Sequence, residues 1–212
     1  MKFQVYTIEN KNISFEQGFI KKAFNFLVNR NEDISIFNHN TINDNIHHIV
    51  FHIPDEHISG TKKGGIDTHL PFSQFINAFI IKNVLFIEVI RKNYLGIITK
   101  FLEEKYKFKI SINKFDTEFI KKCYKPYEGI VKQLDLSTDD GDIIDDGIEK
   151  LKDNDLTKLA SNYIVNFIAF QPLKTNYLIS LDENGITGLN SNNESFIFEW
   201  LKHLEMNIEH TN

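Results

Sequence analysis

The pattern of hydrophobic and polar positions along the first half of the chain predicts two strands that are buried on one face and one strand that is buried on both faces. Residues 2–8 and 46–53 show the two-residue period of a strand that is buried on one face. Residues 83–90 form a continuous apolar run, which is typical of a strand buried on both faces. Between the first two strands, a capping box of Ser14 and Gln17 is followed by apolar residues at helical spacing over 15–27, which predict a helix that ends near Arg30-Asn31.

The second half of the chain predicts a regular succession of helices and strands. Helical spacing is found over 93–105, 117–127 and 142–159, and strand patterns over 108–112, 130–136 and 163–170. When strands and helices alternate, the helices commonly serve as crossovers between parallel strands. We therefore expect part of the sheet to be parallel.

The end of the chain carries the clearest local signal. Asn184-Gly185 separates two apolar runs within 177–189, and this dipeptide supplies the positive φ values that tight hairpins need. Apolar residues over 194–206 then predict an amphipathic helix. The expected fold is α+β (mixed α/β): a mixed, partly parallel β-sheet with packed helices, ending in a β-hairpin and an amphipathic helix.

The domain organisation expected from this pattern is a single globular domain over 1–212. At 42% hydrophobic residues, the chain can bury one substantial core. Pro54 ends the second strand pattern, a glycine-containing loop is expected after it, and Pro71 is placed to open a short helix at 72–79. A soft boundary near 54–71, between 1–54 and 71–212, follows from this loop.

Cysteine usage and hydropathy indicate a soluble, cytoplasmic protein that does not engage a membrane. Cys123 is the single cysteine, so the chain cannot form an internal disulfide. The first residues lack the apolar run of a signal peptide. The longest apolar stretch, 75–90, is interrupted by Lys82 and Glu88 and is too short to span a bilayer.

Six of the eight histidines lie between residues 39 and 69. Strand alternation places His48 and His52 on one side, and two strand histidines with a loop carboxylate can hold a divalent metal. The residues that would form this site in a metal-dependent nuclease or phosphohydrolase are His48, His52, Asp55, His57, Asp67 and His69. The competing interpretation is a solvated strand edge, because the spacing matches no strict ligand pattern.

Basic residues offer a second candidate site, this time for nucleic acid. Glycines at 60, 64 and 65 surround two lysines, but the segment does not match a P-loop. Only two arginines are present, so bidentate recognition of bases or phosphates has little support. The candidate contacts of a lysine-mediated nucleic-acid-binding protein are Lys62, Lys63, Arg91 and Lys92.

Acidic residues are concentrated between 135 and 155, where nine acidic and two basic residues give a local charge of −7 against −5 for the whole chain. The segment lacks the closing glutamate of an EF-hand loop. A solvated helix start is one interpretation. The other is a docking surface for a basic protein partner, formed by Asp139, Asp140, Asp142, Asp145 and Asp146.

No complete catalytic signature accompanies these features, since the sequence holds neither a G-x-S-x-G elbow nor a G-x-G-x-x-G fingerprint. We therefore expect a non-enzymatic protein-interaction or assembly module without a cofactor, acting as a homo-oligomer or in a hetero-complex. Its composition is typical of subunits from bacterial mobile elements and phage-defence complexes that handle nucleic acid. The metal-dependent enzyme and the nucleic-acid-binding protein remain the alternatives.

Overall fold

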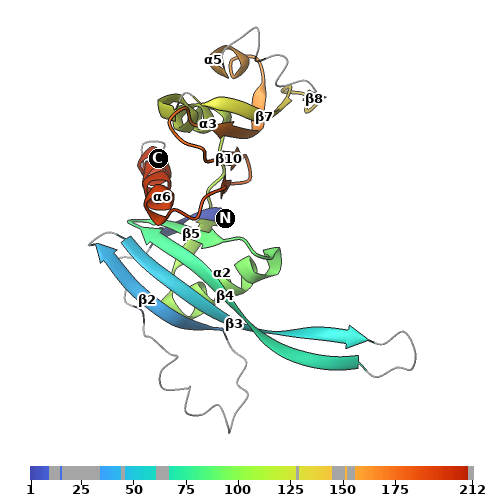
Figure 1. Cartoon of the computed structure of the whole chain (residues 1–212), viewed down its shortest axis with the longest axis vertical. Coiled ribbons are helices and arrows are strands. Elements are labelled where there is room, and N and C mark those ends of the chain that lie inside the picture. The colour runs from blue at the N-terminus through green and yellow to red at the C-terminus, as the bar shows by residue number, and fades with distance from the viewer. Residues whose placement is uncertain are drawn as a thin grey trace. The chain divides into compact units, whose positions relative to one another are not determined.

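The computed structural model describes residues 1–9, 15, 34–43, 46–60, 67–127, 129–144, 151 and 156–209. The chain forms two compact units (Figure 1). One, here called the middle unit, comprises Ile8–Ile110. The other, the terminal unit, joins Met1–Thr7 to Ser111–Asn212. The segment 54–71 lies within the middle unit.

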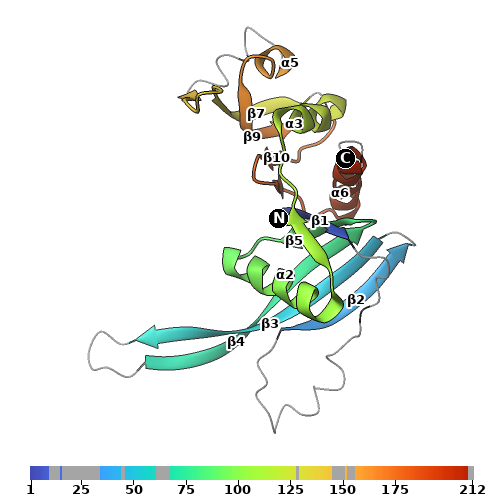
Figure 2. The same cartoon turned by 180° about the vertical axis from the view of Figure 1, so that it is seen from behind.

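The middle unit is a twisted antiparallel sheet with a helix on one face. Its strands lie in the order β2-β3-β4-β5, with the bounds β2 (Ser35–Asn43), β3 (Ile46–Gly60), β4 (Asp67–Ile81) and β5 (Val84–Glu88). Helix α2 (Lys92–Tyr106) covers one face of this sheet (Figure 2). Tyr94, Ile98 and Leu102 recur every four residues and form its buried stripe.

The strands of the middle unit alternate between a buried and a half-open side. Ile49, Phe51 and Ile53 of β3 are at most 3% exposed and lie on the α2 side, where Phe51 packs edge-on against Phe101 (ring centroids 6.1 Å apart). The side chains of His48, Val50 and His52 between them are only half-buried. This two-residue period is the one that the sequence pattern over 46–53 predicts.

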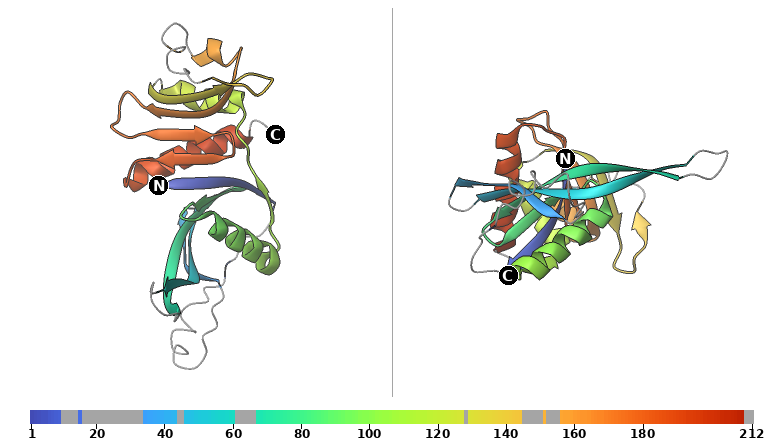
Figure 3. Two further views of the ribbon diagram at one scale, coloured as in Figure 1. Left: turned by 90° about the vertical axis from the view of Figure 1, so that its right-hand side faces the viewer. Right: turned by 90° about the horizontal axis from the view of Figure 1, so that it is seen from below.

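Strands β3 and β4 continue beyond the rest of their sheet as a two-stranded ribbon (Figures 1 and 3). Their pairing runs without a register shift from Ile46↔Ile81 to Gly60↔Asp67. The prediction of a loop over 55–70 and of a helix at 72–79 is therefore wrong, because strand pairing occupies both segments up to Gly60 and from Asp67. Residues 61–66 lie outside the described part of the chain.

The predicted strand ends too early because it stops at Pro54, whereas the ribbon contains two prolines within its strands. Pro54 pairs with Ser73, and Pro71 pairs with Glu56. The pairing of β2 with β3 and of β5 with β4 stops before these positions, so among the described strands both prolines lie on edges of the ribbon that no third strand joins. An edge position whose missing N–H would point outward accepts proline without losing a ladder hydrogen bond.

The terminal unit is also antiparallel, with strand order β1-β11-β10-β9-β7-β8. The bounds are β1 (Lys2–Glu9), β7 (Ile130–Ser137), β8 (Ile143–Ile144), β9 (Ile164–Gln171), β10 (Ile179–Asp182) and β11 (Ile186–Leu189). The chain enters this unit through β6 (Lys109–Ile112), after which the Asn113 amide donates to the Val5 carbonyl (3.0 Å). Its helices are α3 (Thr117–Tyr124), η2 (Lys125–Tyr127), α5 (Leu156–Leu159) and α6 (Glu194–Glu209).

The predicted partly parallel sheet is wrong, since each strand pair with a determined register is antiparallel. The apolar run 84–88 pairs with its hairpin neighbour β4 rather than with a strand beyond a crossover helix. Residues 143–144 form a strand where a helix was predicted from 142. The predicted hairpin, β10 with β11, and the final amphipathic helix α6 are confirmed. The helix predicted from Phe15 to about Arg30-Asn31 lies outside the described residues, apart from Phe15.

His203 on α6 predicts how the stability of the terminal unit depends on pH. Burial lowers its pKa below the usual 6.5, although the hydrogen bond to the Cys123 carbonyl (3.2 Å) acts in the opposite direction. Tyr127 and Trp200 pack against the imidazole ring. The unfolded chain therefore binds a proton at a pH where the folded protein does not, so stability is complete above 6.5 and is lost as the pH falls through that value.

We expect urea unfolding midpoints of the wild type to fall between about pH 7.5 and about pH 5.5, and those of His203→Gln to fall less. Other histidines contribute to the wild-type slope, so the informative quantity is the difference between the two proteins. Equal slopes would show that burial of His203 does not affect its protonation.

Candidate functional site

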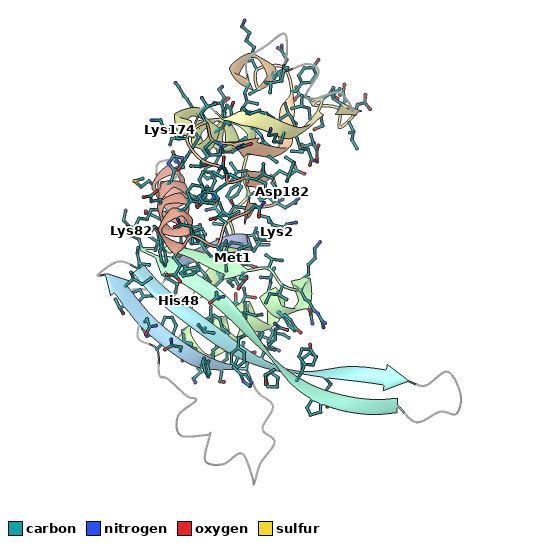
Figure 4. The ribbon with its side chains drawn as sticks, viewed as in Figure 1. Met1, Lys2, His48, Lys82, Lys174 and Asp182 are labelled. Carbon is teal, nitrogen blue, oxygen red and sulfur yellow. The ribbon has the colours of Figure 1, made fainter. Side chains whose placement is uncertain are left out.

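The candidate site is the face of the middle-unit sheet opposite α2, here called the open face. Figure 1 views this side of the sheet, and Figure 2 views the side that α2 covers. Strand alternation and the cross-strand register bring a set of partly exposed side chains to it, which includes Phe37, Asn38, Asn40, His48, Val50, His52, Ser73, Phe75, Asn77 and Glu88. The His48 side chain arises near the start of β3, at the end of the sheet away from the ribbon (Figure 4).

A hydrogen-bonded chain crosses three strands of the open face. The Asn77 side-chain amide donates to Glu88 Oε2 (2.7 Å), and Asn77 Oδ1 lies 3.0 Å from His48 Nε2. Since the amide oxygen can only accept, His48 must donate from Nε2. The His48 ring also stacks on Phe79, with centroids 4.7 Å apart and planes at 15°. These contacts hold His48, Asn77 and Glu88 in one arrangement.

A second group of open-face residues is aromatic. The Phe37 and Phe75 rings meet edge to face with centroids 4.9 Å apart, yet they remain 39% and 43% exposed. His52 lies beside Phe75 (5.4 Å between centroids), and its Nε2 is 2.8 Å from Ser73 Oγ. Burial lowers the pKa of His52 below its usual 6.5, which favours the neutral ring. These residues form an aromatic patch with polar groups around it.

Asp55 lies on the other side of β3, at the N-terminal end of α2. Its carboxylate accepts a hydrogen bond from the Tyr94 hydroxyl and forms an ion pair with the Arg91 guanidinium (3.4 Å). The Arg91 guanidinium also lies over the Phe72 and Tyr94 rings, at 5.9 and 5.8 Å from their centroids. The Tyr94 and backbone hydrogen bonds keep the pKa of Asp55 below its usual value, and burial raises the pKa of Tyr94. This cluster attaches α2 to the base of the ribbon.

The predicted metal ligands are therefore only partly brought together. His48 and His52 share the open face, but Asp55 points to the α2 side. The backbones of His57, Asp67 and His69 belong to the ribbon strands, and their side chains lie outside the described part of the structure. Within the described ranges, no group of three or more His, Cys, Asp or Glu side chains could hold a metal ion.

The predicted nucleic-acid contacts do not form a described cluster. Arg91 is engaged by Asp55, Phe72 and Tyr94. Lys92 is the exposed first residue of α2, and Lys62 and Lys63 lie outside the described residues.

Of the predicted docking acids, Asp139, Asp140 and Asp142 are exposed in the turn between β7 and β8. Thr138 closes this turn, with its amide donating to the Asp142 carbonyl (3.0 Å) and its hydroxyl accepting from the Asp142 amide (3.2 Å). The structure therefore places three of the acids together on a strand turn rather than on a helix start. Asp145 and Asp146 lie outside the described residues.

Sequence reasoning missed Phe37, Phe75 and Asn77 as members of a site. The alternation of Ser73, Phe75 and Asn77 with the more buried Gln74, Ile76 and Ala78 was the available signal. It was obscured because Phe75 and Phe79 are apolar residues on the open-face side of the strand, which breaks the polar–apolar alternation.

Comparisons with known proteins add no family to this description. No protein-family model matches the sequence, and no curated protein matches it. None of the helices in the described ranges has the length and apolar character needed to cross a membrane.

Proposed function

We propose that the chain is a non-enzymatic assembly module, and that its open face binds the open face of a second copy. The observation that carries this proposal is the exposed Phe37–Phe75 pair on a sheet face with little charge. Exposed apolar side chains that contact one another often mark a protein-binding site, whereas single exposed apolar residues scattered over a surface do not. Aromatic residues of this type commonly anchor the centres of interfaces.

Charge favours a protein partner over nucleic acid. The open-face residues named above include no lysine or arginine, and the carboxylate of Glu88 accepts a hydrogen bond from the Asn77 amide. A polyanion requires lysine or arginine to neutralise its phosphates. A second copy meets no such requirement, because two nearly uncharged faces can approach without repulsion despite the net charge of −5.

The polar side chains of the open face can also form hydrogen bonds with the same side chains of a second copy. Asn38, Asn40 and Ser73 each carry groups that both donate and accept hydrogen bonds. Two such faces can therefore satisfy one another around an aromatic centre, in the manner of a sheet packed on a sheet.

The ribbon edges favour binding by the face rather than by strand addition. Pro54 and Pro71 occupy the two free edges of the ribbon. Proline on an edge strand blocks the hydrogen bonding through which another strand would join the sheet. Partner contact through side chains on the face avoids this obstacle.

We expect sedimentation equilibrium to show a weight-average mass that rises from 24.8 kDa towards twice that value as concentration increases. The double variant Phe37→Ser, Phe75→Ser should weaken self-association at least about thirty-fold, since loss of an interface anchor costs about 2 kcal/mol or more. Both rings are about two-fifths exposed, so the variant should retain its fold.

The matched control is Ile97→Ser, which removes an equally exposed apolar side chain (39%) from α2. Its self-association should equal that of the wild type. Hydrogen exchange of the wild type should slow on association in the strands of the open face. A strict monomer at all concentrations, or equal weakening by both variants, would overturn the proposal. Membership of a mobile-element or phage-defence complex remains a prediction from composition.

A further inference from the structure

Two histidines face each other on the α2 side of the middle unit, away from the open face. His39 lies in β2 and His47 in β3, in diagonal positions of the pairs His39↔Ile49 and Thr41↔His47. Their rings stack with centroids 5.3 Å apart and planes at 26°. Nε2 of His39 is 3.1 Å from Nδ1 of His47. This contact is a hydrogen bond between the two rings, in which the tautomers decide which nitrogen donates.

The two histidine rings contact apolar side chains on one side and a hydroxyl on the other. Phe15 packs edge-on against His39 (5.1 Å between centroids) and also contacts Tyr106 and Phe108. On the other side, Thr41 Oγ1 lies 3.5 Å from His47 Nδ1. Both imidazoles are half-buried. The rings are therefore held in place, and each keeps part of its surface exposed.

We propose that His39 and His47 form a two-histidine site for a divalent transition-metal ion such as Zn²⁺ or Ni²⁺, with Nε2 of His39 and Nδ1 of His47 as ligands. A zinc–nitrogen bond of about 2.0–2.1 Å and a tetrahedral angle place two ligating nitrogens about 3.3 Å apart. A metal ion would replace the hydrogen bond of 3.1 Å that joins these two nitrogens, and both rings would turn so that their lone pairs point at the ion. Imidazole is a preferred ligand of these ions.

The environment favours the form of the rings that binds metal. Burial lowers the pKa of both imidazoles, and His47 also lowers that of His39. Neutral imidazole is the metal-binding species. Water would complete the coordination, with Thr41 as a nearby hydroxyl. A metal held this way would link β2 to β3.

Binding is tested on tag-free protein by calorimetry and by urea unfolding with and without Zn²⁺ at neutral pH. The wild type should bind one equivalent and unfold at a higher urea concentration when zinc is present. His39→Gln and His47→Gln should each lose at least about tenfold in affinity, because even outer-shell changes cost that much. The control His203→Gln, which removes a half-buried histidine from the terminal unit, should keep wild-type zinc affinity.

A measurement on the wild type decides the question even if the His39 and His47 variants do not fold. Substoichiometric Ni²⁺ should broaden the imidazole NMR signals of His39 and His47 before those of the other six histidines. Broadening that begins at another histidine, an affinity loss in the His203 control as large as that in the His39 and His47 variants, or no zinc-dependent stabilisation would overturn the proposal.

Discussion

Replacing Trp200 with alanine is expected to lower the free energy of unfolding by about 3–5 kcal/mol. Trp200 lies on α6, is 0% exposed, and is the largest fully buried side chain described. Its ring packs against Tyr127 and Phe170, with centroids 5.4 and 6.3 Å away. Its Nε1–H donates to Thr187 Oγ1 (2.8 Å). Alanine would leave both a cavity and a hydroxyl that has lost its donor.

Two further variants separate these contributions. Thr187→Val removes the hydroxyl and should cost about 1–2 kcal/mol, because the buried indole N–H then has no acceptor there. Met206→Ala, at a position 50% exposed on the same helix, should stay within about 0.5 kcal/mol of the wild type. Since Trp200 is the single tryptophan, the variants are best compared by circular dichroism in urea. A Trp200→Ala cost as small as that of Met206→Ala would contradict the packing described.

Replacing Gly185 with alanine is expected to cost about 2 kcal/mol or more, for two reasons that act together. Gly185 has a φ of +76°, which side-chain-bearing residues rarely adopt. An added Cβ would also overlap the carbonyl oxygen of Asn113, because the backbone after β6 passes directly over the hairpin turn. Neither strain can be relieved without moving backbone.

Gly141→Ala is the matched control for Gly185→Ala. Gly141 has a similar φ of +88°, but nothing lies within 4 Å of an added Cβ. It should therefore show the backbone cost alone, about 1 kcal/mol. Urea midpoints measured for both variants give the part due to crowding as their difference. Equal costs would mean that the approach of Asn113 to the hairpin is not as close as described.

The parts of the fold that sequence predicted are those fixed by local pattern. Asn184-Gly185 and the apolar stripe of 194–206 act within a few residues, so the hairpin and α6 were predicted correctly. Strand direction depends on which distant segments pair, and helical spacing over 93–105 contains no information on that choice. The antiparallel pairing of β5 with β4 was for this reason missed.

The sequence did not predict the ribbon or the open face, because the structural effect of these residues depends on which strands lie beside them. Pro54 ends a central strand but fits a free edge, and the pairing that makes it an edge lies in β2 and β5. Alternation correctly placed His48 and His52 on one side of β3. It gave no indication of Asn77 or Ser73, which reach these histidines from β4.

The pairing of β1 with β11 has a consequence for the order in which the chain acquires its structure during synthesis. Lys2, Phe3 and Gln4 pair with Gly188, Thr187 and Ile186. The segment 8–110 is contiguous, so the ribosome releases all of it before residue 186 exists. While the middle unit folds, the backbone groups of β1 that pair with β11 therefore have no strand partner yet. Closing so long a loop is slow compared with local pairing. We infer that the terminal unit is completed last, when its two distant segments finally meet.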